Sequence, residues 1–467
     1  MTVVRFALMV AVSASLTIPA TAFAAEEAPV VVTASGPVRG AVADGVNQWL
    51  GIPFAAPPVG AHRWRAPQPV ARWSGVRDAT RYGHDCAQQP FPSDAAPLGT
   101  DPSEDCLVVN VWRPQAARAR LPVIVWIYGG GFVNGGSSAK TYAGAHLARQ
   151  GVMVVSFNYR VGRLGTFVHP ALDREAGAPT SGNFGYMDQL AALRWVRANA
   201  AVFGGDPQNV TIVGESAGGM SVNTLVTSPV TKGLFQRAVI MSGGDGESGP
   251  ADRGAAEQAS LAFAASRGIR PDDPQAAAKL RALTTDQVVD GLNMRALFSG
   301  GSAPRSFASP YADGQISFPV ATTYRSGRFP HVPIMIGATS ADIGGPDGMM
   351  IGGARKLAGM IAAAGAPTYY YRFSYVANSV PAGGGAGHAT DIPFFFDTQR
   401  VKYGAATTAR DDAIGRAISA YLVNFATSGD PNGDGLPIWR RYDQKTAMMM
   451  DFTVDGTASQ RADAPGQ

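Results

Sequence analysis

One serine lies in a pattern that is typical of a catalytic nucleophile. Ser216 is the centre of Gly214-Glu215-Ser216-Ala217-Gly218, a G-x-S-x-G sequence. Residues 209–213 before it are short, β-branched and apolar, which predicts a buried strand, and residues 217–226 are long enough for about three helical turns. The flanking glycines leave room where a Cβ would clash, so the hydroxyl stands clear of the sheet at the positive end of the new helix. The five-residue pattern also occurs in Gly-rich turns, but the strand before it and the helix after it favour a nucleophile.

A serine hydroxyl needs a general base, and the base needs an acid that orients it. Of the six histidines, His388 is favoured, because it follows a Gly-rich run and lies late in the chain, as the order serine, acid, histidine requires. The acid is expected between the two, just beyond a sheet strand. Asp342 directly follows a predicted strand and is the first choice, and Asp347, a few residues further on, is the alternative. Asp313 precedes that strand and is expected to form a turn.

The negative oxygen of a tetrahedral intermediate needs hydrogen-bond donors, and main-chain N–H groups supply them where no side chain blocks access. Tyr128-Gly129-Gly130-Gly131-Phe132 directly follows an apolar run. This is typical of the Gly-rich oxyanion loop of esterases and lipases, although a flexible turn would also be rich in glycine. We therefore expect the N–H groups of Gly130, Gly131 and Ala217 to form an oxyanion hole.

Apolar runs predict the strands that position these residues, at 107–112, 122–128, 152–157, 238–241, 332–337 and 369–373. Helical patterns lie at 186–200 and 411–426, and the alternation of strands and helices predicts a mostly parallel sheet with helices on both faces. A small hairpin is predicted at 30–40, and an Ala-rich helical segment at about 243–305 is expected to be a reduced cap. Prolines and glycines predict a rigid loop at 49–60, and the polar tail after Phe452 is expected to fray.

The first residues are typical of a secretory signal. Arg5 precedes an apolar run, and Ala22-Phe23-Ala24 offers a small-x-small cleavage site after Ala24. This predicts a signal peptide at 1–24, a single domain at 25–467, and export to the periplasm or medium. In an oxidising compartment the two cysteines, Cys86 and Cys106, are expected to pair, the alternative being two free buried thiols.

The composition limits the partners of the chain. The formal net charge of +4 is spread over 467 residues without a basic run, so nucleic acid is not an expected partner. The apolar part of the signal is too short for a stable membrane anchor, and no spacing of cysteine and histidine suggests zinc. We expect a site that works without metal or cofactor on a small-molecule substrate; the oligomeric state is not encoded in any pattern.

Together these motifs resemble the type-B carboxylesterase family, which includes cholinesterases and bacterial para-nitrobenzyl esterases. The similarity covers most of the chain after the signal. Besides the serine and glycine motifs, it rests on Gly51-Ile52-Pro53-Phe54-Ala55, Ser103-Glu104-Asp105-Cys106-Leu107, Asn158-Tyr159-Arg160-Val161-Gly162, Phe203-Gly204-Gly205-Asp206-Pro207 and the segment from His388 to Pro393. The resemblance implies an α/β-hydrolase fold and a serine esterase.

The resemblance also implies roles for individual residues. Ser216, His388 and Asp342 would form the triad, with Glu215 a buried carboxylate beside the nucleophile. Cys86 and Cys106 would form a disulfide, and Arg63 would pair with Glu104. Two departures stand out: the acid lies in Ala341-Asp342-Ile343-Gly344 where many members carry Asp-Glu-Gly, and only 45 residues separate the acid from the base. The helices over the site are therefore expected to be cut back.

The sequence thus predicts an exported serine carboxylesterase that acts through an acyl-enzyme. A short cap and a mild positive charge are compatible with bulky or anionic esters, including plant-wall, polyester and mycotoxin esters. A non-catalytic adhesion scaffold of the same fold, a lipase and an amide hydrolase are the alternatives.

Overall fold

The computed structural model describes residues 2–3, 28–91, 94–117, 120–247, 252–298, 306–381 and 383–463. The expected signal peptide therefore lies almost entirely outside the described residues. Among the described residues, no helix combines the length and apolarity needed to cross a bilayer.

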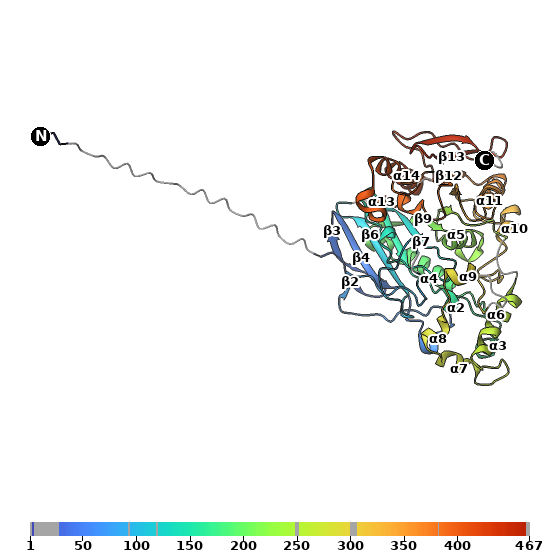
Figure 1. The fold of residues 1–467 in the computed structure, drawn as a ribbon. Coiled ribbons are helices and arrows are strands. Elements are labelled where there is room, and N and C mark those ends of the chain that lie inside the picture. Colours follow the sequence, from blue (N-terminus) through green and yellow to red (C-terminus); the bar gives the residue numbers. More distant parts are fainter. Residues whose placement is uncertain are drawn as a thin grey trace.

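The main feature is an 11-stranded sheet (Figure 1). In spatial order it contains β14 (Ala458–Ala462), β13 (Met448–Phe452), β12 (Thr368–Phe373), β11 (Ile334–Thr339), β10 (Arg237–Met241), β9 (Gly205–Glu215), β7 (Leu121–Ile127), β8 (Met153–Phe157), β6 (Val108–Pro114), β4 (Val46–Pro53) and β3 (Ala41–Ala43). Neighbouring strands run parallel from β8 to β13 and antiparallel at both edges. The predicted, mostly parallel sheet is confirmed.

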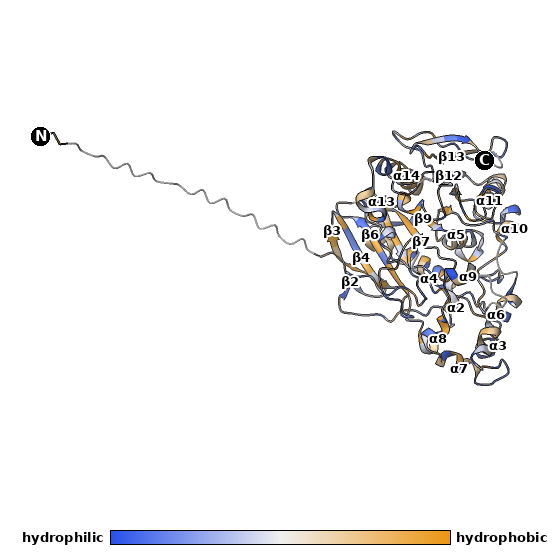
Figure 2. Ribbon diagram, in the orientation of Figure 1, coloured by the Kyte–Doolittle hydropathy of each residue, from blue (hydrophilic) through white to orange (hydrophobic). Residues whose placement is uncertain are grey.

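The central strands are apolar because both faces of the sheet are covered. In β7, residues 123–127 are fully buried, and Figure 2 shows hydrophobic colouring along β4, β6, β7 and β9. On one face, α4 (Phe184–Asn199) and α5 (Ala217–Thr227) pack together, and the side-chain amide of Gln189 donates to Ser221 Oγ at 2.9 Å. On the other face, α1 (Ala145–Arg149) and α14 (Ala409–Ser428) are joined by a bond from Gln150 Nε2 to Ser419 Oγ at 3.0 Å.

The remaining helices are shorter or lie beyond the sheet. They are α2 (Gly162–Gly165), α3 (Pro170–Ala176), α6 (Arg253–Ser266), α7 (Ala276–Ala282), α8 (Thr285–Val289), α9 (Met294–Phe298), α10 (Val320–Arg325), α11 (Ile351–Ala363), α12 (Ile392–Phe395) and α13 (Gln399–Tyr403), with single turns η1 (Gly60–His62), η2 (Lys140–Tyr142), η3 (Ala200–Phe203), η4 (Pro229–Thr231) and η5 (Gly404–Ala406). The segment expected to be a reduced cap contains α6 to α9.

The predicted hairpin is present as β1 (Val30–Val32) and β2 (Pro37–Arg39), which pair antiparallel, with β5 (Arg77–Asp78) parallel to β2. The prediction of a loop over 49–60 is wrong for its first part, since β4 runs on to Pro53. The ladder of β4 accommodates this by a register shift at Leu50 and Gly51, where Gly51 takes φ +69°.

The prediction of a frayed tail after Phe452 is also wrong. Residues 458–462 form β14, which pairs antiparallel with β13 as the edge of the sheet. Asp463 beyond it is buried and accepts from Arg355 Nε at 2.6 Å and from the Tyr370 hydroxyl at 2.7 Å. The polar composition of this segment suits an exposed edge strand, and the buried ion pair fixes its end.

Candidate active site

Ser216 occupies the sharp turn between β9 and α5. Its φ of 55° and ψ of −123° are strained for a residue with a side chain, and its N–H is held by the Met241 carbonyl at 2.9 Å. A Cβ added at Gly214 would lie 2.3 Å from the Gly218 carbonyl oxygen, and one added at Gly218 would lie 2.0 Å from that of Ile127. Only glycine fits at these two positions, so the packing of β7, β9 and α5 holds the serine in its strained conformation.

His388 lies between Ser216 and Asp342. Its Nε2 is 2.9 Å from Ser216 Oγ, and its Nδ1 is 2.6 Å from Asp342 Oδ1. The loop that carries the histidine is tied to the loop that carries the acid, because Ala341 N donates to Ala386 O at 2.8 Å. The three residues chosen from the sequence thus form one continuous chain of hydrogen bonds.

The carboxylate of Asp342 is almost fully enclosed by donors. Its Oδ2 accepts from Ser242 Oγ at 2.6 Å and from Thr339 Oγ1 at 2.9 Å, while Oδ1 also accepts from Ile343 N at 2.7 Å. Burial alone would raise the pKa of Asp342, but the hydrogen bonds from His388, Ser242 and Ile343 outweigh it and lower the pKa. An ionised acid at this position holds the Nδ1–H tautomer of His388, which leaves Nε2 free to accept the serine proton.

The alternative acid, Asp347, lies outside this network. Its side chain is 80% exposed, and its nearest cation is Arg355, at 3.6 Å. It has no hydrogen bond to His388, so the geometry favours Asp342 over Asp347.

Two further buried carboxylates lie beside His388. Glu215 Oε1 is 3.3 Å from His388 Nε2, and burial raises the pKa of Glu215. Asp391 is fully buried, accepts from the Tyr371 hydroxyl at 3.3 Å, and has its pKa raised to about 7 by burial and by the charge of Asp342. Burial by itself would lower the pKa of His388, but these carboxylates together raise it.

No role for Ser242 or Asp391 was predicted from the sequence. Ser242 lies at the end of β10 with φ +47°, and its N–H donates to Gly337 O at 2.8 Å. A serine that ends a buried strand before two glycines is a weak signal. Asp391 lies in the segment from His388 to Pro393, and a carboxylate three residues after the base is a signal in the sequence that could have identified it.

The Gly-rich loop after β7 approaches the serine closely. A Cβ at Gly129 would lie 2.9 Å from Ser216 Cβ, and Gly130 and Gly131 take φ of +108° and +61°. The Gly130 carbonyl accepts from Val133 N at 3.1 Å, so the N–H of Gly131, which points the opposite way across the same trans peptide, faces out of this turn. Within the described part of the chain, no acceptor reaches the N–H of Gly130, Gly131 or Ala217, and three unused donors are what an oxyanion requires.

The serine opens into a cleft of about 900 Å³, including the space open to solvent. Gly129 and Gly130 line it, together with apolar or aromatic residues such as Phe91, Met294, Ile392 and Tyr403. Polar and charged side chains line it as well, among them Asp94, Thr141, Glu215, Thr390 and Lys402. Met294 comes from α9, and its main-chain N–H donates to Asn134 Oδ1 at 2.7 Å, which joins the segment expected to be a cap to the residues that follow the Gly-rich turn.

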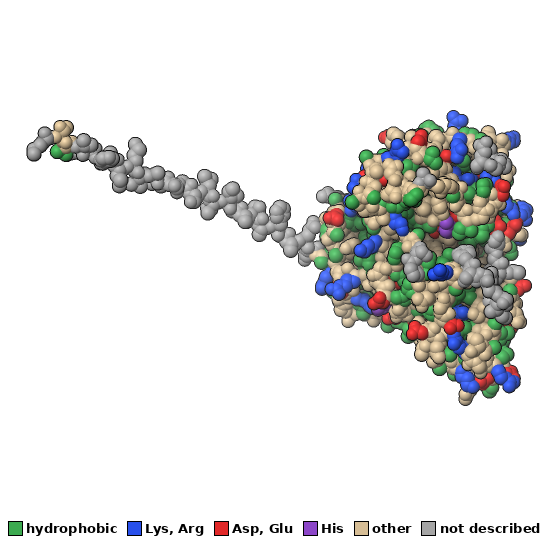
Figure 3. All heavy atoms as spheres, in the orientation of Figure 1, with side chains coloured by type: hydrophobic (Ala, Val, Ile, Leu, Met, Phe, Trp, Pro, Cys, Tyr) green, Lys and Arg blue, Asp and Glu red, His purple; other side chains and the backbone are tan. Residues whose placement is uncertain are grey.

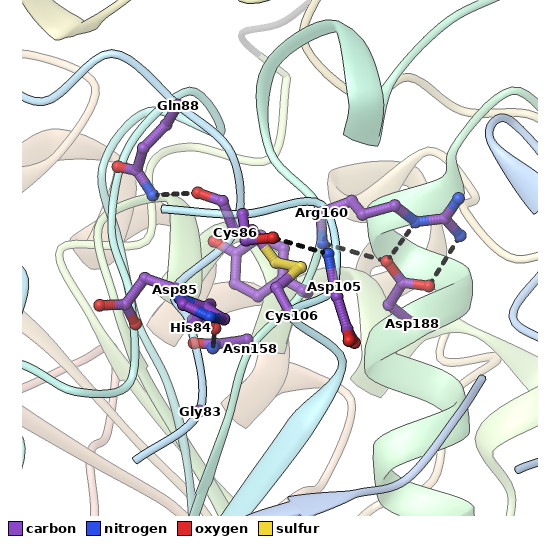
Figure 4. Close-up of a disulfide and its surroundings, with 12 residues drawn as sticks. Gly83, His84, Asp85, Cys86, Gln88, Asp105, Cys106, Asn158, Arg160 and Asp188 are labelled. Atoms are coloured by element: carbon purple, nitrogen blue, oxygen red, sulfur yellow. Dashed lines mark hydrogen bonds and ion pairs between the residues drawn. A yellow bond between two sulfur atoms is a disulfide. The ribbon is translucent and has the colours of Figure 1, made fainter. Parts of the chain in front are cut away.

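The predicted disulfide is confirmed. Cys86 and Cys106 are bonded, with their Cα atoms 5.0 Å apart (Figure 4). Two residues after Cys86, the side-chain oxygen of Gln88 accepts hydrogen bonds from Gly135 N at 2.9 Å and from Asn134 Nδ2 at 3.1 Å. The disulfide therefore fixes a loop that supports the residues directly after the Gly-rich turn.

The expected ion pair between Arg63 and Glu104 is also present. Arg63 Nε donates to Glu104 Oε2 at 2.8 Å, and both side chains are buried. Arg63 Nη1 also donates to the carbonyl oxygens of Arg281 and Leu283 at the end of α7. This arginine thus anchors the helical segment to the body of the protein.

The mixed sheet, the strained serine between β9 and α5, and the order Ser216, Asp342, His388 define an α/β-hydrolase. The chain belongs to the carboxylesterase family. The sequence profile described as Carboxylesterase family matches residues 27–346 and 345–465.

Individual relatives agree with this assignment. The chain is 48% identical over 214 residues to fumonisin B1 esterase of Sphingopyxis macrogoltabida, an alignment that covers 45% of this chain and 39% of that protein. It is 50% identical over 219 residues to para-nitrobenzyl esterase of Bacillus subtilis (strain 168), an alignment that covers 46% of this chain and 43% of that protein. These two alignments span less than half of either relative. A third, 34% identical to a medium-chain fatty acyl-CoA hydrolase precursor of Anas platyrhynchos, covers 89% of this chain and 87% of that protein. A solved structure of PNB esterase superposes with a TM-score of 0.82 at 29% identity, covering 94% of this chain and 98% of that one.

Proposed function

We propose that the protein is an exported serine carboxylesterase. The observation that carries the proposal is the chain of hydrogen bonds from Ser216 through His388 to Asp342, next to three unused N–H groups. The arrangement supplies a nucleophile, a base, an orienting acid and an oxyanion site in one cleft.

The proposed reaction has two halves. His388 Nε2 accepts the proton of Ser216 as its oxygen attacks the ester carbonyl, and the N–H groups of Gly130, Gly131 and Ala217 receive the negative oxygen. His388 then donates that proton to the leaving alcohol, and the acyl group stays on the serine. In the second half His388 takes a proton from water while the water oxygen attacks the acyl carbon. His388 then returns this proton to Ser216 Oγ as the bond between the serine and the acyl group breaks, which releases the carboxylic acid and restores the free enzyme. Each oxyanion donor is expected to contribute about 3 kcal/mol to the lowering of the barrier.

Export and substrate range are part of the proposal. The disulfide between Cys86 and Cys106 supports an oxidising compartment, which fits cleavage of the signal near Ala24. The similarity to a protein named fumonisin B1 esterase supports bulky or anionic esters, mycotoxin esters among them, as substrates.

The test is hydrolysis of 4-nitrophenyl butyrate by the chain that begins after Ala24. We expect turnover by the parent and a loss of at least about 10⁴-fold in Ser216→Ala. Ser326→Ala, an exposed serine whose Oγ donates to Thr323 O, is the matched control and should retain full activity. A folded parent with no activity on any ester would support a binding scaffold instead, and an undiminished Ser216→Ala variant would contradict the proposed nucleophile.

A further inference from the structure

One cationic side chain reaches the cleft that contains Ser216. Among the described residues that line it, Lys402 is the only lysine or arginine. It stands on α13, and its ammonium donates to the main-chain oxygen of Ala95 in the 94–96 segment, which lines the same cleft. An ammonium carries three donors, and this contact uses one of them.

The helix that carries Lys402 is firmly anchored. Thr398, at its N-terminus, donates through Oγ1 to Thr141 O at 2.9 Å, which fixes α13 to η2. Gln399 donates to Asp412 on α14 at 3.2 Å, and Arg400 pairs with the same carboxylate. The packing of the neighbouring elements therefore holds the backbone of Lys402 at the cleft, and its exposed side chain extends from this fixed helix.

Lys402 forms no ion pair with a carboxylate of the described residues. No Asp or Glu oxygen of the described residues lies within 4 Å of its Nζ, whereas Lys279 and Lys356 each form an ion pair at 2.6 Å. Asp94 interacts electrostatically with Lys402, but its Oδ1 accepts a hydrogen bond from Ala96 N at 3.0 Å instead. Burial raises the pKa of Asp94, and the charge of Lys402 partly offsets this. The ammonium is thus bound to a neutral carbonyl and faces a cleft whose described lining contains no other lysine or arginine.

Polar side chains share the cleft with Ser216 and Lys402. Tyr142 is one of them: burial raises its pKa, and the charges of Glu215 and Asp94 raise it further, so both carboxylates lie within electrostatic range of its hydroxyl. Thr141 and Tyr403 line the same cleft. Hydroxyl groups in the same cleft as an ammonium that pairs with no carboxylate of the described residues are suited to binding a carboxylate of the ligand.

We propose that Lys402 binds a carboxylate of the substrate, so that the enzyme prefers esters with a free carboxylate in the acid or the alcohol part. This inference rests on the proposed esterase activity and names the substrate class for the same cleft. Figure 3 shows Lys, Arg, Asp and Glu side chains interspersed on the visible face. A preference for anionic esters would thus come from this single side chain rather than from long-range attraction.

The experiment compares kcat/KM for two pairs of esters. In the first pair the acyl group carries the charge: mono-4-nitrophenyl adipate against 4-nitrophenyl hexanoate. In the second the leaving group carries it: 4-(butyryloxy)benzoate against phenyl butyrate. The variants are Lys402→Gln, which keeps a donor for the Ala95 oxygen but no charge, Lys402→Arg, which keeps the charge, and Lys445→Gln, an exposed lysine outside the cleft, as matched control.

We expect Lys402→Gln to lower kcat/KM for the charged ester of at least one pair by about fivefold to tenfold, and to leave both neutral esters within about twofold. Lys402→Arg and Lys445→Gln should keep the parent's preference for charged over neutral esters. This preference should become smaller when NaCl is raised from 20 mM to 500 mM, because salt screens the attraction between the ammonium and the carboxylate. Asp94→Asn should raise kcat/KM for the charged ester, because it removes a like charge.

Two results would overturn the proposal. An equal loss for charged and neutral esters in Lys402→Gln would mean that the lysine only holds the 94–96 segment in place. No change for any ester in either pair would mean that the ammonium does not contact the substrate. Failure of the esterase proposal itself is separate, because the parent would then hydrolyse neither neutral ester faster than Ser216→Ala.

Discussion

Replacing Asp342 tests the arrangement of the site in a way that depends on individual hydrogen bonds. In Asp342→Asn the amide must place its oxygen at one carboxylate position and its NH₂ group at the other. The Oδ1 position faces two N–H donors, His388 Nδ1 at 2.6 Å and Ile343 N at 2.7 Å. The Oδ2 position faces the hydroxyls of Ser242 and Thr339, which can rotate to accept, and one N–H at a longer 3.2 Å. The amide is therefore expected to point its NH₂ group at the hydroxyls.

This orientation sets the size of the effect. The amide oxygen still accepts from His388 Nδ1–H, so the imidazole keeps the tautomer that can take the serine proton. The variant loses the negative charge that stabilises the imidazolium. A hydrogen bond to a charged group contributes about 3 kcal/mol, so kcat should fall by about 10²-fold. Asp342→Ala removes both the charge and the orientation, and about 10⁴-fold is expected.

The assay is the steady-state kcat for 4-nitrophenyl butyrate, with Asp347→Asn as the matched control. That control changes an exposed carboxylate in the same loop and should stay within about twofold of the parent, as surface substitutions do. Equal activity of Asp342→Asn and Asp347→Asn would refute Asp342 as the acid. A loss in Asp342→Asn as large as that in Asp342→Ala would refute the argument about the hydroxyl partners.

Three further outcomes follow from the structure. In the pH profile of kcat/KM, the midpoint of the acid limb should lie above pH 6.5, because neighbouring carboxylates raise the pKa of His388 and the base works only when neutral. Glu215→Gln removes one of these charges and should move the midpoint to lower pH. A shift to higher pH would contradict the assignment of His388 as the base. Replacing both Cys86 and Cys106 with serine should lower the free energy of unfolding by about 3 kcal/mol in urea titration, and an unchanged midpoint would show that the bond contributes nothing. Burial lowers the pKa of His169 to about 4, below its usual 6.5, so its share of the stability is complete above pH 6.5 and is lost as the pH falls towards 4. His169→Asn can still accept the N–H of the helix that His169 caps, and it should reduce the loss of unfolding free energy between these pH values by on the order of 3 kcal/mol; an unaltered profile would count against this.

Local patterns were sufficient to predict the elements that carry the chemistry. The strand, turn and helix around Ser216 are contiguous in sequence, so β-branched residues, flanking glycines and a helix of sufficient length identify them together. The Gly-rich loop after β7 was predictable for the same reason, since its glycines follow directly on an apolar strand. His388 and Asp342 were chosen from the order of catalytic residues along the chain. The hydrogen bond between them could be seen only in the folded structure.

Features formed by distant segments could not be predicted. Ser242 lies 100 residues from Asp342, and only the parallel pairing of β10 with β11 brings its hydroxyl to the acid. The edge strand β14 is polar because one side of it faces solvent, and its composition alone resembles a loose tail. Lys402 follows no motif, and its place at the cleft depends on the packing of α13 against η2 and α14.

Covalent labelling is the most direct test of whether Ser216 is the residue that attacks the ester. A 4-nitrophenyl phosphonate ester places a tetrahedral phosphorus where the ester carbonyl would be attacked, and the attacking oxygen displaces 4-nitrophenolate. We expect one equivalent of 4-nitrophenolate per chain, loss of esterase activity in parallel, and the added mass on the peptide that contains Ser216. Labelling should be much slower in His388→Ala. Labelling of any other residue, or full loss of activity with Ser216 unmodified, would contradict it.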